Sequence, residues 1–378
     1  MPTPRVTLLD VARRAGVSRT TASFVMAGRT DMRISAEAEH RVLHAARELN
    51  YRPNLMARSL RTKLTRTIGL VSDTIATEAF AGELIRGSLS TALTHQHLLF
   101  VGETEGDDTV EDQLVQDMLD RGVDGFLYAS MYTRWAQPPA LLHGHPFVLL
   151  NCLSRDEQIA AVLPDERRAG HSAARALLDA GHRDRIHLVG ETPPEVFAAV
   201  ERRAGIEEVL AAAGVRLAGT VECLWWPESA YEAVRRFHDA GGRASAFICL
   251  NDRVAFGAYQ ALAEADLSVP ADVSVVSFDD SHLASWLRPQ LTSLAIPHFE
   301  LAKRAVELLL AGPGGGGVHR VPMPLRERAS VGPPAAGLGS FRGAQAEPGF
   351  GGAEHPQRGP AGPAGGRGRV PRQAPRRW

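Results

Sequence analysis

The chain has 378 residues, of which 44% are hydrophobic and 22% charged, so it holds enough apolar material for two or three globular units. No apolar run reaches the roughly 18 residues that a membrane span needs, and the N-terminus has no signal-peptide core, so we expect a cytoplasmic protein without membrane contact. The net charge of −1 conceals an asymmetry: residues 1–66 carry +8, residues 67–334 carry −14 and residues 335–378 carry +5. A basic end on an acidic body indicates that attraction for nucleic acid is confined to that end.

The cysteines and histidines predict neither a metal site nor a disulfide framework. Cys152, Cys223 and Cys249 are widely spaced, and each lies in or beside an apolar run. Buried free thiols are the expected state of such residues in a cytosolic protein. The 14 histidines are scattered without metal-ligand spacing, so we expect no cofactor.

Residues 7–29 predict two short helices joined by a tight turn. Thr7 and Asp10 have the spacing of a capping box, which satisfies the free amides at a helix start. Gly16 interrupts the first apolar pattern, and Ser18 can cap a second helix. Two helices at this separation are typical of a helix-turn-helix, whose second helix enters the DNA major groove. An ordinary helical hairpin is the alternative interpretation.

The second of these helices should present an outward face that suits DNA. Apolar residues recur on its other side at helical spacing. The outward face holds Arg19, Thr20, Thr21, Ser23 and Phe24. Guanidinium and hydroxyl groups are suited to phosphates and base edges.

Two further helical segments follow. Residues 35–49 predict an amphipathic helix, with Glu37 and Glu39 in the first turn, where the helix dipole favours anions. Pro53 then ends one element, and the residues after it, 54–60, predict a helix of barely two turns. A helix this short is not stable alone in water.

From Thr67 onward, short apolar runs alternate with amphipathic stretches. Runs such as IGLVSD, FVLLNC and TVECLWW predict strands, and stretches such as GELIRGSLSTALTHQ predict helices between them. This alternation is typical of an α/β fold whose parallel sheets are covered on both faces. The run is too long for one doubly wound sheet, so we expect two parallel-sheet subdomains with a ligand cleft between them.

These segments together resemble the LacI family of bacterial transcription regulators, over about Thr7 to Pro334. The resemblance implies a helix-turn-helix headpiece at 1–52, a hinge helix and linker at 53–66, and an effector-binding and dimerisation core at 67–334. It also implies that the core shares its fold with periplasmic sugar-binding proteins, in which the chain crosses between subdomains three times. The implied N-subdomain is about 67–164 and 297–325, and the implied C-subdomain is about 165–296 and 326–334, closed by the strand PLRERASV.

The resemblance also implies which residues contact DNA. Arg19, Thr20 and Phe24 occupy the base-contacting positions of the recognition helix, although Phe24 stands where well-studied members have Arg or His. Leu60 matches the hinge leucine that wedges into the minor groove, which kinks DNA; its alternative is a linker residue packed on the core. Asn54 and Ala57 belong to the same hinge helix. The expected phosphate contacts, for which capping or solvation is the alternative, are Thr7, Ser18, Thr21 and Ser23.

A second set of residues is expected to bind an effector. Asp252 in ICLND matches the family's effector-binding aspartate, and Arg202 in VERRAGI matches its arginine, with the adjacent Arg203 as the competing assignment. Trp225 falls where relatives place an aromatic ring that stacks on the ligand. The weaker candidates are Asp73, Phe80 and Asp165. The alternatives are a helix N-cap for Asp73 and Asp165, and core packing for Trp225 and Phe80.

The last segment, residues 335–378, is dominated by Gly, Ala, Pro and Arg without a hydrophobic period, so we expect a disordered low-complexity tail. It is either the product of read-through or a frameshift, which we favour, or a basic extension that adds non-specific DNA affinity.

The sequence therefore predicts a homodimeric transcription regulator that binds double-stranded operator DNA and responds to a small effector, a sugar or its phosphate. A repressor is the commonest form in the family. A solute-binding protein of a transporter is the alternative, but it would need a signal peptide and no basic headpiece. An enzyme is not expected, because the P-loop, GxSxG, HExxH and dinucleotide-binding motifs are all missing.

Overall fold

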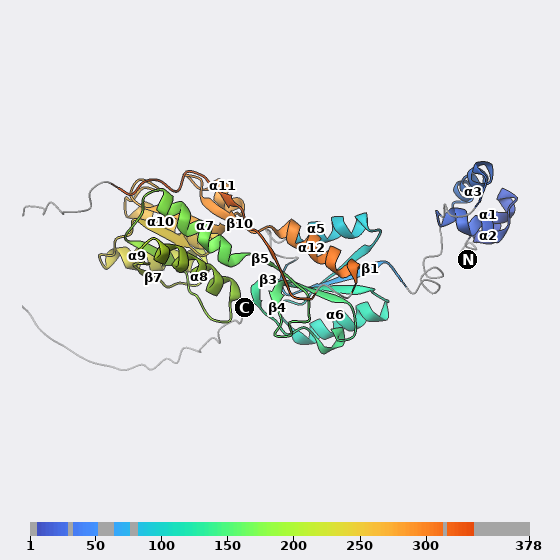
Figure 1. Ribbon diagram of the computed structural model, residues 1–378, viewed down its shortest axis with the longest axis horizontal. Coiled ribbons are helices and arrows are strands. Elements are labelled where there is room, and N and C mark those ends of the chain that lie inside the picture. The colour runs from blue at the N-terminus through green and yellow to red at the C-terminus, as the bar shows by residue number, and fades with distance from the viewer. Residues whose placement is uncertain (1–5, 29–32, 52–63, 76–81, 313–315, 336–378) are drawn as a thin grey trace, which may run out of the picture.

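The computed structural model describes residues 6–28, 33–51, 64–75, 82–312 and 316–335. Three helices form the N-terminal headpiece, and two α/β subdomains form the core (Figure 1). The predicted tail at 335–378 lies outside the described residues except for Ala335. In the described part of the chain, no helix is long and apolar enough to cross a membrane.

The headpiece consists of α1 (Leu8–Ala15), α2 (Arg19–Met26) and α3 (Ala36–Glu48). The predicted capping box is present at the start of α1, where the Thr7 amide donates to the Asp10 carboxylate at 2.9 Å and the Asp10 amide donates to the Thr7 hydroxyl at 3.4 Å. Gly16 ends the helix in the left-handed region, with φ of +67°. Val11, Ala22 and Val42, one from each helix, are fully buried together and form the centre of this small core.

The first core subdomain is a six-stranded parallel sheet in the order β11-β5-β4-β3-β1-β2. Its strands are β1 (Thr67–Ser72), β2 (Leu98–Glu103), β3 (Gly125–Trp135), β4 (Phe147–Leu153), β5 (Ala161–Pro164) and β11 (Val318–Val321). Helices α5 (Gly82–Thr94) and α12 (His298–Ala311) cover one face, and α6 (Asp108–Asp120) with the short 3₁₀ turn η1 (Ala140–Leu142) covers the other.

The second subdomain is built in the same way, in the order β12-β10-β9-β8-β6-β7. Its strands are β6 (Ile186–Val189), β7 (Gly219–Val221), β8 (Ala246–Cys249), β9 (Ser274–Asp279), β10 (Thr292–Ala295) and β12 (Leu325–Arg326). Helices α7 (Glu166–Asp179) and α8 (Phe197–Ala212) pack on one face, and α9 (Pro227–Asp239) and α10 (Asp252–Glu264) pack on the other, followed by the short α11 (His282–Trp286). The prediction of two parallel-sheet subdomains is confirmed.

Two strands differ from the sequence-based expectation. β12 pairs with β10 in the antiparallel direction, and it follows β11, which belongs to the other sheet. β7 ends at Val221, well before the end of the run TVECLWW, because its partner β6 ends at Val189. Trp225 therefore lies beyond the strand, in the connection to α9.

The last residues of β3 reach from the first subdomain to the second. The pairing of β3 with β4 shifts register between Ala129 and Arg134, and the strand then continues to Trp135. The Thr133 hydroxyl lies 3.3 Å from the carboxylate of Glu166 on α7, and the Trp135 ring meets that of Phe197 on α8 edge-on at 6.0 Å. The chain itself also passes between the two sheets after β5, after β10 and after β11.

Helices α7 and α8 cross closely because a glycine lies on each of them. A side-chain carbon at Gly170 would overlap the carbonyl oxygen of Arg202, and one at Gly205 would overlap that of Arg167. We expect Gly205→Ala to lower the free energy of unfolding by about 1–3 kcal/mol, as overpacking of a tight contact does. Urea unfolding measures this change. The control is Gly82→Ala, at a site with open space, and equal effects of the two substitutions would contradict the prediction.

The three cysteines confirm the expectation from composition. Cys152, Cys223 and Cys249 are free and buried. Burial raises the pKa of the Cys152 and Cys223 thiols to about 12, so these groups stay protonated at neutral pH. They pack as small apolar side chains within the two subdomain cores.

Candidate DNA-binding and effector-binding sites

Helix α2 presents a polar outward face. Ser18 caps the helix, because its hydroxyl accepts from the Thr21 amide at 3.0 Å. Arg19 and Thr20, the first two residues of the helix, are exposed, and Ser23 is half-buried. Ala22 and Val25 hold the opposite face against α1 and α3. The outward face therefore carries the guanidinium and hydroxyl groups that the sequence predicts for DNA contact.

Some of the expected phosphate contacts already have hydrogen-bond partners in the headpiece. The Thr7 hydroxyl donates to Asp10 at 2.7 Å, and the hydroxyls of Ser18 and Thr21 lie 2.8 Å apart. The capping alternative is thus confirmed for Thr7 and Ser18, and their backbone amides and hydroxyls lie at helix N-termini, where phosphates bind favourably. Phe24 is half-buried.

Four predicted residues lie outside the described part of the chain. They are Asn54, Ala57 and Leu60 of the expected hinge helix, and Phe80 of the first loop in the core.

Arg202 is the centre of a buried group of charges at the boundary of the two subdomains. It lies on α8 with a side chain only 2% exposed, and its guanidinium binds the Glu166 carboxylate through Nε at 2.7 Å and Nη2 at 3.3 Å. Nη1 donates to the carbonyl of Leu250 at 2.5 Å and lies 3.9 Å from the carboxylate of Asp279. We call Glu166, Arg202, Asp252 and Asp279 the carboxylate cluster.

Arg203, the competing assignment, lies differently. Its side chain is 37% exposed and pairs with Glu207 at 2.8 Å on the outside of α8. It also donates to the Thr192 hydroxyl at 3.2 Å. Consecutive helical residues point about 100° apart, so only one of the two arginines can face the boundary, and that one is Arg202.

Asp252 is fully buried at the first position of α10, after the end of β8. One carboxylate oxygen accepts from the amide and hydroxyl of Ser281, at 2.7 and 2.9 Å, and the other accepts from the Ser293 hydroxyl at 2.8 Å. Burial raises the pKa of Asp252 to about 6, against the effect of these hydrogen bonds. The serines thus take up most of the acceptor capacity of the carboxylate, so Asp252 supports its neighbours in this conformation.

Asp279 was missed by the sequence analysis. It lies at the end of β9 with φ of +106°, and its side chain is 15% exposed. Burial raises the pKa of Asp279 to about 8; Arg202 opposes the shift, and the charges of Asp252 and Glu166 add to it. The signal was available, because Asp279 follows an apolar strand in the same way as Asp252, and acids at the carboxyl ends of parallel strands meet at one edge.

Two other residues of the boundary were also missed. Glu166 follows Asp165 directly, and the helix-start pattern drew attention to the first acid alone. Asn151, in β4, is 2% exposed with φ of +58°, and it accepts from the Thr133 hydroxyl at 2.7 Å. A left-handed conformation of a buried asparagine marks strain of the kind that collects at functional sites, but no sequence pattern predicts it.

Of the weaker effector candidates, Asp165 caps a helix, whereas Asp73 binds residues of β3. Asp165 caps α7, accepting from the Arg168 amide at 3.3 Å, so its N-cap alternative is confirmed. The same alternative is wrong for Asp73, because residues 74 and 75 are not helical. The Asp73 carboxylate instead accepts from the amides of Thr74 and Met131, at 2.8 and 2.9 Å, and pairs with Arg134 at 3.2 Å.

Trp225 belongs both to the core and to the boundary. Its partly buried ring packs against the apolar residues on both faces of the second sheet, and its indole nitrogen donates to the Glu191 carbonyl at 3.0 Å. The guanidinium of Arg202 lies 5.6 Å from the ring centroid, and 4.6 Å from that of Phe278. Aromatic faces near polar groups are the usual surroundings of a ligand with apolar and hydroxyl faces.

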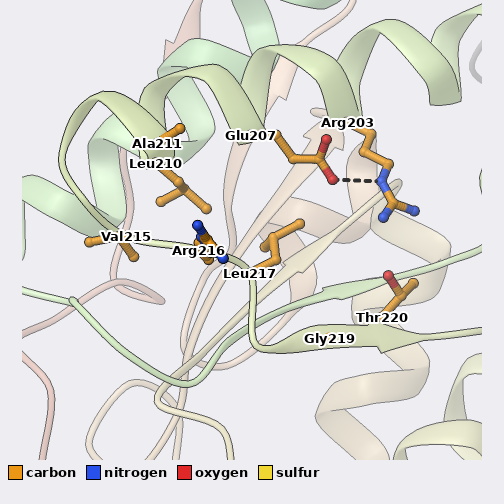
Figure 2. A pocket seen from close by; sticks show the side chains of 9 residues that line it. All are labelled: Arg203, Glu207, Leu210, Ala211, Val215, Arg216, Leu217, Gly219 and Thr220. Atoms are coloured by element: carbon orange, nitrogen blue, oxygen red, sulfur yellow. Dashed lines mark hydrogen bonds and ion pairs between the residues drawn. The ribbon is translucent and has the colours of Figure 1, made fainter.

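A separate surface pocket of about 350 Å³ lies on the outside of the second subdomain (Figure 2). It is lined by the C-terminal half of α8, the connection that follows and the edge strand β7. The ion pair between Arg203 and Glu207 stands at its rim, and Leu210, Val215 and Leu217 line it with apolar side chains. Arg202, Trp225 and Asp252 do not line it, whereas Arg203, the competing assignment, does.

The headpiece with its outward helix, joined to two similar parallel-sheet subdomains, defines a DNA-binding regulator with a ligand-binding core. Comparison with known proteins agrees: the model of bacterial regulatory proteins of the lacI family matches residues 7–54, and that of the periplasmic binding protein-like domain matches residues 174–331. The protein belongs to the LacI family of bacterial transcription regulators.

Individual relatives cover most of the chain. The HTH-type transcriptional regulator AscG of Escherichia coli K12 is 32% identical over 82% of this chain and 93% of its own. The ribose operon repressor of Haemophilus influenzae is 32% identical over 80% of this chain and 91% of its own. Among solved structures, a lac repressor dimer bound to operator and an anti-inducer matches with a TM-score of 0.71 and 25% identity, over 87% of this chain and 100% of its own. These relatives are regulators rather than enzymes, as the missing catalytic motifs predict.

Proposed function

We propose that the protein is a cytoplasmic homodimeric repressor that binds a roughly palindromic operator and is controlled by a sugar-like effector bound between the subdomains. The observation that carries the proposal is the carboxylate cluster. It lies where strand ends of the second subdomain meet Thr133 of the first, 3.3 Å from Glu166, so a ligand there touches both subdomains. A ligand in this position can change the angle between them.

The headpiece supports the DNA-binding part of the proposal. Arg19 and Thr20 are exposed at the start of a capped helix, and the +8 charge of residues 1–66 supplies the salt-dependent attraction for phosphates. Two headpieces in a dimer would bind two half-sites, one each.

The names of relatives support a sugar effector. Two of them are a ribose operon repressor and a sucrose operon repressor, and one matching structure is a regulator in complex with cellobiose. Coupling between effector and DNA is reciprocal, so operator DNA must change the affinity for the sugar by the same factor.

Exposed apolar side chains support dimerisation. Leu89 and Leu93 on α5 lie near the edge strand β2, whose exposed residues include Leu98, Phe100 and Val101. An open edge strand with apolar side chains is a surface that monomers avoid, because it invites association. Trp286 on α11, 68% exposed, gives the second subdomain an apolar residue of the same kind.

The proposal is tested by fluorescence anisotropy with labelled duplexes that carry the palindromes upstream of the gene, titrated with neutral sugars. Tight, salt-sensitive binding to one palindrome, released by one sugar, is expected. Strengthening of the complex by the ligand would replace an inducible repressor with a corepressor system. Failure to bind any palindrome would contradict the proposal.

Arg19 provides the sharper test of the recognition helix. We expect Arg19→Ala to remove about 1–3 kcal/mol of discrimination at one base pair in each half-site, the usual worth of a bidentate arginine–guanine contact. Binding to random DNA should remain. The matched control is Arg41→Ala, an exposed arginine on α3 that pairs with Glu37. An equal loss of affinity for all sequences would instead make Arg19 a phosphate contact.

A further inference from the structure

The carboxylate cluster holds three acidic side chains and one cation. Its one cation, Arg202, faces Glu166 with two hydrogen bonds and has Asp279 at 3.9 Å. Glu166 is 2% exposed and Arg202 is equally buried, so water does little to weaken this pair. The guanidinium edge formed by Nε and Nη2, which suits a carboxylate or phosphate, is therefore already filled by the protein.

The first subdomain repeats this arrangement on its side of the boundary. Arg134, near the end of β3, pairs with Asp73 at 3.2 Å, and the two side chains are 30% and 15% exposed. A further arginine whose charge reaches Asp279 is Arg253, and its guanidinium rests on the ring of Trp226, 4.6 Å from the centroid. Arg134 and Arg202 are thus each paired with a carboxylate of the protein.

An anionic ligand and a neutral one would meet this site very differently. A phosphate or carboxylate group that approached Arg202 would face the Glu166 carboxylate, and would have to displace this buried group from its two hydrogen bonds to the guanidinium. A sugar hydroxyl can donate to the same carboxylates and leave the Glu166–Arg202 pair intact. Negative charges placed together without water between them repel strongly, so the site discriminates by charge.

We propose that Glu166 is a specificity-determining residue, which holds Arg202 neutralised so that the site takes neutral polyhydroxylated effectors and rejects phosphorylated or carboxylated ones. The inference rests on the proposed function, since it assumes that the effector binds at this cluster. It chooses between the two ligand chemistries that the sequence leaves open, a sugar and its phosphate. Glu166 acts on Arg202 in two ways: its negative charge neutralises the guanidinium, and its carboxylate fills the position where an anionic group of the ligand would bind.

The test compares matched ligand pairs on the full chain by calorimetry: ribose with ribose 5-phosphate, glucose with glucose 6-phosphate, and sucrose with sucrose 6-phosphate. For the pair that contains the effector, the wild type should bind the neutral member at least tenfold more tightly. Glu166→Gln keeps the shape of the side chain and an acceptor for Arg202, but removes the charge. It should reduce that ratio at least tenfold, and inorganic phosphate should raise the melting temperature of this variant only.

The matched control is Glu207→Gln, which removes the partner of the neighbouring, exposed Arg203 and should leave the ratio unchanged. Equal or tighter wild-type binding of the phosphorylated member would overturn the inference, and this measurement needs no variant to fold. An unchanged ratio in folded Glu166→Gln would overturn it as well. With either result, the proposed function still stands if a ligand releases the operator DNA. If none of the sugars or sugar phosphates binds and none releases the DNA, the proposed effector site is itself wrong.

Discussion

Replacing Arg202 with methionine is expected to lower the free energy of unfolding by about 3–5 kcal/mol, the usual cost of removing one partner of a buried ion pair. Methionine fills a similar volume but leaves the Glu166 carboxylate buried without its cation, and leaves the Leu250 carbonyl without its donor. Urea unfolding of the full chain, followed by tryptophan fluorescence, measures the loss. We also expect that sugar no longer releases the operator from this variant, because Arg202 connects α8 to Glu166, which contacts Thr133 of the first subdomain.

Arg203→Met is the matched control, one residue further along the same helix. Arg203 is partly exposed and pairs with Glu207 in solvent, so its replacement should change the free energy of unfolding by less than about 1 kcal/mol. Equal losses in the two variants would mean that burial of the Arg202 pair adds nothing. In that case the pair could not carry the specificity that we assign to Glu166.

The headpiece could be predicted almost completely from sequence because local rules determine it. The capping box of Thr7 and Asp10, the left-handed Gly16 and the Ser18 cap each depend on residues three or fewer apart. Rules of this range act before any tertiary contact forms, and the three helices then need only their apolar faces to pack. What this part of the chain binds depends instead on side chains that point into solvent.

The core was predictable in type and less so in detail. The alternation of apolar runs and amphipathic helices determines the two parallel sheets, but it says nothing about the register shift in β3 or the reversed direction of β12. Both concern how strands that are far apart in the chain pair with one another, which local patterns do not determine. The β3 shift has consequences for function, because it carries Thr133 and Trp135 to the second subdomain.

The sequence predicted the principal residues of the site but not the residues with which they pair. Arg202 and Asp252 stand at positions that family resemblance selects, and helix geometry then separates Arg202 from Arg203. The sequence could not predict that Ser281 and Ser293 donate hydrogen bonds to Asp252. Nor could it predict that Glu166 pairs with Arg202, because all these contacts join residues 29 to 41 positions apart. The partner that a buried charge finds is decided by packing, and it determines what remains available to a ligand.

The raised pKa of Asp279 leads to the second large effect, a fall in stability as the pH rises. Burial and the nearby Asp252 and Glu166 carboxylates raise the pKa of Asp279 to about 8, so the folded chain keeps a proton that the unfolded chain releases above about pH 4. The contribution of Asp279 to stability is therefore greatest below about pH 4 and falls until the pH passes the folded pKa. One retained proton corresponds to a slope of about 1.4 kcal/mol per pH unit.

Asp279→Asn should remove this slope, so the variant should gain about 1 kcal/mol over the wild type between about pH 6.5 and 7.5. Burial lowers the pKa of His182, His187 and His298, but these residues titrate alike in both proteins, so their effect cancels in the difference. Urea unfolding at a series of pH values measures the difference. Glu300→Gln, an exposed carboxylate on α12, should leave the slope unchanged. If the free energy of unfolding of wild type and Asp279→Asn changed in parallel with pH, the prediction would be wrong. Asp279 would then be ionised in the folded chain, with Arg202 as the cation for both Glu166 and Asp279.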